Sequence, residues 1–99
     1  MDLKNKKFIF IVNPNSGKLS KKKKVKLITE CFPSNPDIVF TKNSQETSFL
    51  SAQAFKNKTI VISCGGDGTA NIVANQAIIH DGLMSIFPFG RGNDFAKFI

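Results

Sequence analysis

The sequence has no tryptophan or tyrosine, only two cysteines and a single histidine. Cys31 and Cys64 lack CxxC spacing and His80 has no second histidine to act with, so we expect no metal site built from such a cluster. Sparse cysteine favours a reducing cytoplasm. The longest apolar run, residues 8–12, is far shorter than the roughly 20 residues that a membrane-spanning helix needs. No small-residue cleavage site follows that run, so we expect no export signal.

The size and composition are those of one soluble globular domain over residues 1–99. Hydrophobic residues make up 41% and charged residues 21% of the 99, and ten phenylalanines supply the bulk of the apolar volume. A chain of this length is long enough to fold around one core and too short for two independent domains.

The positive charge is concentrated at the front of the chain. Residues 1–26 hold nine lysines and one aspartate, a balance of +8, whereas residues 27–99 have a balance of −1. This asymmetry predicts an anionic partner such as nucleotide phosphates or an acidic membrane leaflet. Nucleic acid is disfavoured because no aromatic RNA-binding motif accompanies the charge. The lysine run at residues 21–24 fits lipid headgroups, but a solvated helix face is the commoner explanation of such a run.

Predicted strands and helices alternate along the chain. Apolar runs predict strands at residues 7–12, 37–41, 59–64 and 85–88, while apolar spacing of three and four predicts helices at 19–32, 44–55 and 69–79. Ser20, Ser44 and Thr69 are the expected helix caps. The alternation predicts a three-layer, Rossmann-like α/β domain with a mainly parallel sheet and ligands at the carboxyl ends of the strands.

Three polar, glycine-containing turns follow the first, third and fourth strands, at residues 13–17, 65–69 and 89–94. In a parallel sheet all three meet at one edge, which favours a binding site there. The central turn, Gly65 to Thr69, leads into a helix. Glycines let the backbone approach a phosphate closely and adopt positive φ, so that amide hydrogens and the helix dipole face the anion.

Two widespread phosphate motifs do not fit this turn. GxxxxGK[ST] fails because no glycine lies five residues before Gly17, and GxGxxG fails because Asn71 stands where the third glycine belongs. Asp67 would repel a phosphate unless it holds Mg²⁺-bound water, a ribose hydroxyl or a neighbouring amide. A tight strand-to-helix turn capped by Asp67 is the structural alternative.

The segments IVNPNSG (11–17), GGDGT (65–69) and PFGRGNDFA (88–96) together resemble the three motif blocks of the diacylglycerol kinase catalytic domain family, in order and spacing. That family includes bacterial diacylglycerol kinases and the sphingosine and ceramide kinases. NAD kinases share GGDGT and a similar sheet, but they generally lack the other two blocks and rank second.

The resemblance implies that the chain binds ATP with Mg²⁺ and serves transfer of the γ-phosphate to a lipid hydroxyl, such as that of diacylglycerol, at a membrane surface. It places nucleotide contacts on Asn13, Pro14, Asn15, Ser16, Gly17, Thr41, Gly65, Gly66, Asp67, Gly68, Thr69, Ala70, Asn71, Ile72 and Arg91. Within these residues Asp67 is the best candidate for a catalytic role.

The chain departs from the family pattern at two positions, since Arg91 stands where Thr or Ser is usual and Ile72 stands where an acidic residue is usual. The resemblance also implies a second, β-rich domain that supplies the catalytic base, a Mg²⁺ site and much of the lipid pocket, and that lies outside these 99 residues. We therefore expect the chain alone to bind nucleotide weakly and to turn over poorly or not at all.

Two further expectations concern partners. An apolar surface over residues 89–99 would favour self-association, and the chain is expected in the cytoplasm or peripherally at the membrane. The alternative function is a non-catalytic module that binds a membrane or a protein through its basic face.

Overall fold

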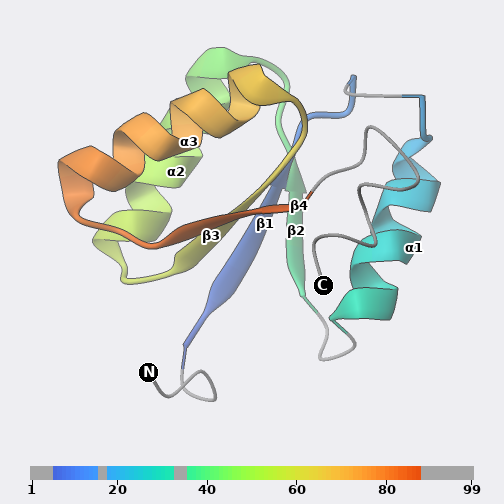
Figure 1. Cartoon of the computed structure of the whole chain (residues 1–99), viewed down its shortest axis with the longest axis horizontal. Coiled ribbons are helices and arrows are strands. Elements are labelled where there is room, and N and C mark those ends of the chain that lie inside the picture. The colour runs from blue at the N-terminus through green and yellow to red at the C-terminus, as the bar shows by residue number, and fades with distance from the viewer. Residues whose placement is uncertain (1–5, 16–17, 33–35, 88–99) are drawn as a thin grey trace.

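The computed structural model describes residues 6–15, 18–32 and 36–87. Within them, helices and strands alternate as the sequence predicts (Figure 1). The elements, in chain order, are β1 (Phe8–Val12), α1 (Lys21–Cys31), β2 (Asp37–Phe40), α2 (Ser44–Lys56), β3 (Ile60–Cys64), α3 (Asp67–His80) and β4 (Met84–Phe87).

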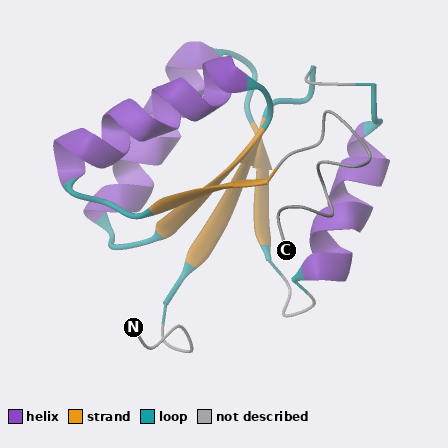
Figure 2. Ribbon diagram, in the orientation of Figure 1, coloured by secondary structure: helices purple, strands orange, loops and turns teal. Residues whose placement is uncertain are grey.

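The four described strands form one sheet in the order β2-β1-β3-β4. All three pairings are parallel, and the register places Val12 opposite both Phe40 and Cys64. The carboxyl ends of β1, β2 and β3 therefore meet at one edge of the sheet, which confirms the predicted α/β fold. Figure 2 shows this sheet between its helices.

Helices cover both faces of the sheet, with α1 on one face and the adjacent pair α2 and α3 on the other (Figure 1). Alternate residues of the strands point to opposite faces, because side chains in a strand alternate. Phe10 and Val12 pack in the core under α1, whereas Ile11 and Val61 pack in the core under α2 and α3. Among the described residues, no helix is both long and apolar enough to cross a membrane.

The predicted cap at Ser20 is confirmed, and two further helix ends are defined by the structure. The Ser20 hydroxyl caps α1 by accepting a hydrogen bond from the Lys23 N–H at 3.1 Å. Asn57 caps the C-terminus of α2, and Asp81, in the left-handed conformation at φ 53°, ends α3.

Two predicted caps are wrong. Helix α2 is capped by Asn43, whose Oδ1 accepts from the Glu46 N–H at 2.8 Å, and Ser44 is already the first helical residue. Helix α3 begins at Asp67 and has Gly66 at its N-cap without a side-chain hydrogen bond, so Thr69 lies inside the first turn. The residue before each helix, Asn43 for α2 and Gly66 for α3, has extended backbone, which is the conformation that an N-cap requires.

Candidate functional site

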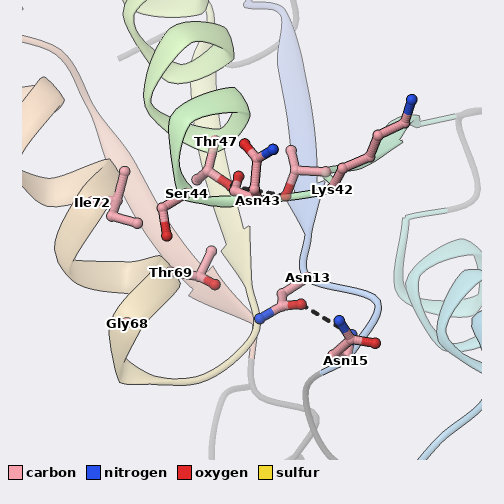
Figure 3. Close-up of a pocket in the computed structure, with 10 residues that line it drawn as sticks. Asn13, Asn15, Lys42, Asn43, Ser44, Thr47, Gly68, Thr69 and Ile72 are labelled. Atoms are coloured by element: carbon pink, nitrogen blue, oxygen red, sulfur yellow. Dashed lines mark hydrogen bonds between the residues drawn. The ribbon is translucent and has the colours of Figure 1, made fainter.

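A pocket of about 240 Å³ lies at the carboxyl edge of the sheet, where the turns after β1 and β2 meet the start of α3 (Figure 3). It is lined by Asn13, Asn15, Thr41, Lys42, Asn43, Ser44, Thr47, Gly68, Thr69 and Ile72. Most of these residues are polar, and Lys42, which is exposed, is the ionisable residue among them. The described wall of the pocket is therefore mainly polar, with one positive charge.

Asn13 is the first residue after β1 and is held in place by several groups. Its N–H donates to the Cys64 carbonyl at 3.0 Å, which extends the contact between β1 and β3 by one residue. Its Oδ1 accepts from the Asn15 N–H at 3.0 Å. Figure 3 shows the Asn13 side chain with this oxygen toward Asn15 and its nitrogen on the side of α3. The structure thus brings both asparagines of the predicted NPNSG turn to the pocket.

The glycines of the GGDGT turn have different surroundings. A Cβ atom on Gly65 would lie 3.1 Å from Thr69 Oγ1 and 3.2 Å from Asn13 Cβ, so Gly65 allows the β1 turn and α3 to approach each other. Among the residues that the structure describes, a Cβ atom on Gly66 or Gly68 would meet no atom within 4 Å outside its own helix and chain neighbours. The expected positive φ is wrong, because none of these glycines has φ in the left-handed region and Gly66 has φ −89°. Open space in front of the backbone distinguishes these two glycines.

Within the part of the chain that the structure describes, the N–H groups at the N-terminus of α3 have no hydrogen-bond acceptor. The first intrahelical bond runs from the Ala70 N–H to the Gly66 carbonyl at 3.2 Å, so the N–H groups of Asp67, Gly68 and Thr69 precede it and are the donors that a helix N-terminus offers to an anion. Thr69 is buried at the pocket wall, whereas Asp67 is exposed beside the pocket and is not part of its lining.

Of the remaining predicted contacts on α3, one lines the pocket. Ile72 is half-buried and contributes an apolar wall where the family resemblance implies an acid. Ala70 is half-buried and Asn71 is exposed, and neither lines the pocket.

The turn after β2 completes the pocket and was missed by the sequence analysis except for Thr41. Thr41 is buried, and its Oγ1 accepts from the Thr47 hydroxyl at 2.8 Å, which joins the end of β2 to the first turns of α2. The segment between them supplies Lys42, Asn43 and Ser44 to the lining. The signal in the sequence is a polar strand-to-helix turn at the same edge of the sheet. This turn contains no glycine, so the pattern of glycine-containing turns does not include it.

The lysine run of α1 contains one buried member. Lys21, Lys22 and Lys23 are exposed as a solvated helix face would be, but Lys24 is 0% exposed. Its Nζ donates to the carbonyls of Asn13 at 3.1 Å and Pro14 at 3.0 Å. Burial lowers the pKa of Lys24 because the ammonium loses its hydration.

Several predicted features lie outside the described residues, namely Ser16, Gly17, Arg91 and the apolar surface over residues 89–99. In the ranges that the structure describes, no group of three or more His, Cys, Asp or Glu side chains could hold a metal ion. Cys64 is buried at the end of β3, and burial raises the pKa of its thiol, so it is a core residue and not a reactive thiol.

Comparison with known families identifies the family of the chain. A family model for the diacylglycerol kinase catalytic domain matches residues 7–99. The chain belongs to this family. It is therefore a kinase-family domain, and the family predicted from the sequence is confirmed. None of the curated proteins compared with the chain matches it.

Solved structures of similar fold come from Bacillus anthracis strain Sterne. The crystal structure of a diacylglycerol kinase from this strain has a TM-score of 0.72 and 24% identity, with 93% of this chain and 36% of that chain covered. Two further structures from the strain have TM-scores of 0.72 and 0.71 and identities of 24% and 26%. Each alignment covers 93% of this chain, and 34% and 35% of theirs. The chain thus spans about a third of the length of the structures it matches.

Proposed function

We propose that the chain is the ATP-binding part of a lipid kinase, which transfers the γ-phosphate of ATP to a lipid hydroxyl such as that of diacylglycerol. The observation that carries this proposal is that no atom of the described residues occupies the space in front of Gly66 and Gly68 at the N-terminus of α3, where Gly68 lines the pocket. A phosphate chain placed there would accept hydrogen bonds from the unpaired N–H groups of the first turn. The nucleoside would then extend along the polar wall made by Asn13 and Thr41.

The donor set also fits a magnesium ion that arrives with the nucleotide. Mg²⁺ in kinase sites is held by one or two carboxylates together with substrate phosphates and water. Asp67 is the carboxylate nearest in sequence to the two open glycines, and it is exposed to solvent on the same turn. We assign Asp67 to the water shell of this ion, which would neutralise phosphate charge.

The part of the pocket that the structure describes holds no group for the proton transfer that accompanies phosphoryl transfer. A kinase needs a group that accepts the proton of the attacking hydroxyl. The described lining offers asparagine, serine, threonine and lysine side chains but no carboxylate or imidazole. We therefore propose that the 99 residues bind nucleotide but by themselves transfer phosphate poorly or not at all. We place the protein in the cytoplasm or at the membrane periphery as part of the same proposal.

The first test is a titration of the protein with Mg-ADP and Mg-ATP, followed by calorimetry and by backbone amide NMR shifts. We expect saturable binding that shifts the amides of Asn13, Thr41 and residues 65–69. Absence of saturable binding at millimolar nucleotide would contradict the proposal.

A matched pair of variants tests the assignment of Asp67. Asp67→Ala should weaken Mg-ADP binding and reduce its dependence on magnesium. Asp37→Ala removes the same charge from an exposed residue at the amino end of β2, on the opposite edge of the sheet, and should leave binding unchanged. Equal effects of the two variants would refute a local role of Asp67. Assay with ATP and diacylglycerol vesicles should give background turnover, and robust turnover would contradict the proposed inactivity.

A further inference from the structure

The position of Lys24 on α1 places its side chain on the buried face of the helix. Residues three and four apart share one face of a helix, so Lys24 lies on the face of Leu27 and Ile28. Ile28 is fully buried in the core under α1, and Leu27 packs against that core. The three preceding lysines are exposed, with Lys21 Nζ 5.5 Å from the centre of the Phe40 ring, and the fourth is buried with its ammonium at the end of β1.

The ammonium of Lys24 lies where the hydrogen bonds between strands end. The Val12 carbonyl accepts from Thr41 N–H, and Asn13 N–H donates to Cys64, at 3.0 Å each. The next two carbonyls, of Asn13 and Pro14, turn to Lys24 Nζ at 3.1 and 3.0 Å. One donor group on two consecutive carbonyls fixes the orientation of both peptide planes.

These peptide planes determine how Asn13 presents its side chain. The Pro14 carbonyl and the Asn15 N–H belong to one peptide group, and no described peptide bond is cis, so the two point in opposite directions. With the carbonyl held toward α1, the N–H points away from α1 and donates to Asn13 Oδ1 at 3.0 Å. The side chain of Asn13, which lines the pocket, is thereby held in one orientation.

We propose that Lys24 is a positioning residue for nucleotide binding, which sets the orientation of Asn13 through the carbonyls of Asn13 and Pro14. This inference rests on the proposed function of the pocket. Burial removes hydration from the Lys24 ammonium, and even for buried ion pairs replacement by apolar residues of similar volume is often neutral or stabilising. Stability of α1 alone would therefore favour an apolar residue here, whereas holding two carbonyls requires a donor.

The experiment compares Lys24→Met with Lys23→Met, which removes the same charge from the exposed neighbour. Mg-ADP affinity is measured by calorimetry, folding by circular dichroism, and the nucleotide-free state by the NMR signals of the Asn13 side-chain amide and the Asn15 N–H. For Lys24→Met we expect a folded protein, a shifted Asn13 amide signal, faster hydrogen exchange of the Asn15 N–H, and an affinity about tenfold weaker. Lys23→Met should match the wild type in every readout.

A folded Lys24→Met protein with the affinity and Asn13 signal of Lys23→Met would overturn the proposal. Should Lys24→Met fail to fold, Lys24→Gln is the second variant, since it retains a shorter donor. It should show a smaller loss of affinity in the same direction, and unchanged affinity would overturn the proposal. Fast exchange of the Asn15 N–H in the wild type would do so as well, without any variant. If the wild type binds no nucleotide, the proposed function fails, and the NMR signals still report whether Lys24 orients Asn13.

Discussion

Replacing Gly68 with alanine should make the protein more stable and a poorer binder of nucleotide. Gly68 is the second residue of α3, and a Cβ atom there would meet no atom of the other described elements within 4 Å. Its φ lies outside the left-handed region, so an alanine can adopt the same backbone without strain. Glycine is therefore not needed at this position for folding, and alanine should stabilise the helix.

The size of the gain follows from backbone entropy. Replacing glycine with alanine at a compatible helical position stabilises a protein by about 0.4–1 kcal/mol, because the unfolded alanine has fewer conformations to lose. We expect the lower end of this range in a first turn, and about 0.5 kcal/mol corresponds to a melting temperature raised by about 2–4 °C in a domain of this size.

The loss of binding follows from the same open space. Gly68 lines the pocket, and the added methyl group would occupy the place from which a phosphate oxygen approaches the backbone N–H groups. Loss of one hydrogen bond to a charged group is worth about 1.5–3 kcal/mol, which is about a 10- to 100-fold loss of affinity.

Thermal unfolding followed by circular dichroism and calorimetric titration with Mg-ADP measure the two effects on the same samples. Asn75→Ala is the matched control, since Asn75 is exposed on α3 outside the pocket and alanine should stabilise the helix without changing affinity. Gly65→Ala should instead destabilise the protein, because its Cβ atom would be crowded by Thr69 and Asn13. A Gly68→Ala protein that binds Mg-ADP like the wild type would refute the placement of phosphate at this turn.

Three further outcomes are expected. Gly82→Ala should destabilise the protein by about 1–3 kcal/mol in urea unfolding, since a Cβ atom there would lie 2.7 Å from Phe55 Cγ; unchanged stability would mean that the ring moves aside freely. Asn43→Ala should lower the free energy of unfolding by about 1 kcal/mol, because it removes the cap of α2, whereas Ser44→Ala should change that free energy little. A larger loss in Ser44→Ala than in Asn43→Ala would contradict the assignment of the cap. Burial lowers the pKa of Lys24 below its ordinary 10.5, so between the folded and the unfolded pKa the unfolded chain binds more protons than the folded protein. The free energy of unfolding should therefore rise with pH in that window. The same measurement on Lys24→Met should show no such rise.

The sequence by itself determined the order of elements and the family. Each strand is a short apolar run and the buried residues of each helix recur three or four positions apart, so the local pattern alone separates them. The cap at Ser20 and the end of α3 at Asp81 are also local, because a turn or cap is built from neighbouring residues. The carboxyl ends of parallel strands necessarily meet, so the place of the pocket followed from the alternation of elements.

Only the tertiary structure decided which residues of those patterns form the site. Four adjacent lysines are alike in sequence, yet Lys24 is buried with its ammonium on the turn after β1, whereas the other three are exposed. Likewise Gly65 is crowded by Asn13 and Thr69, while Gly66 and Gly68 face open space. These differences depend on atoms that are distant along the chain, so composition, periodicity and spacing contain no record of them.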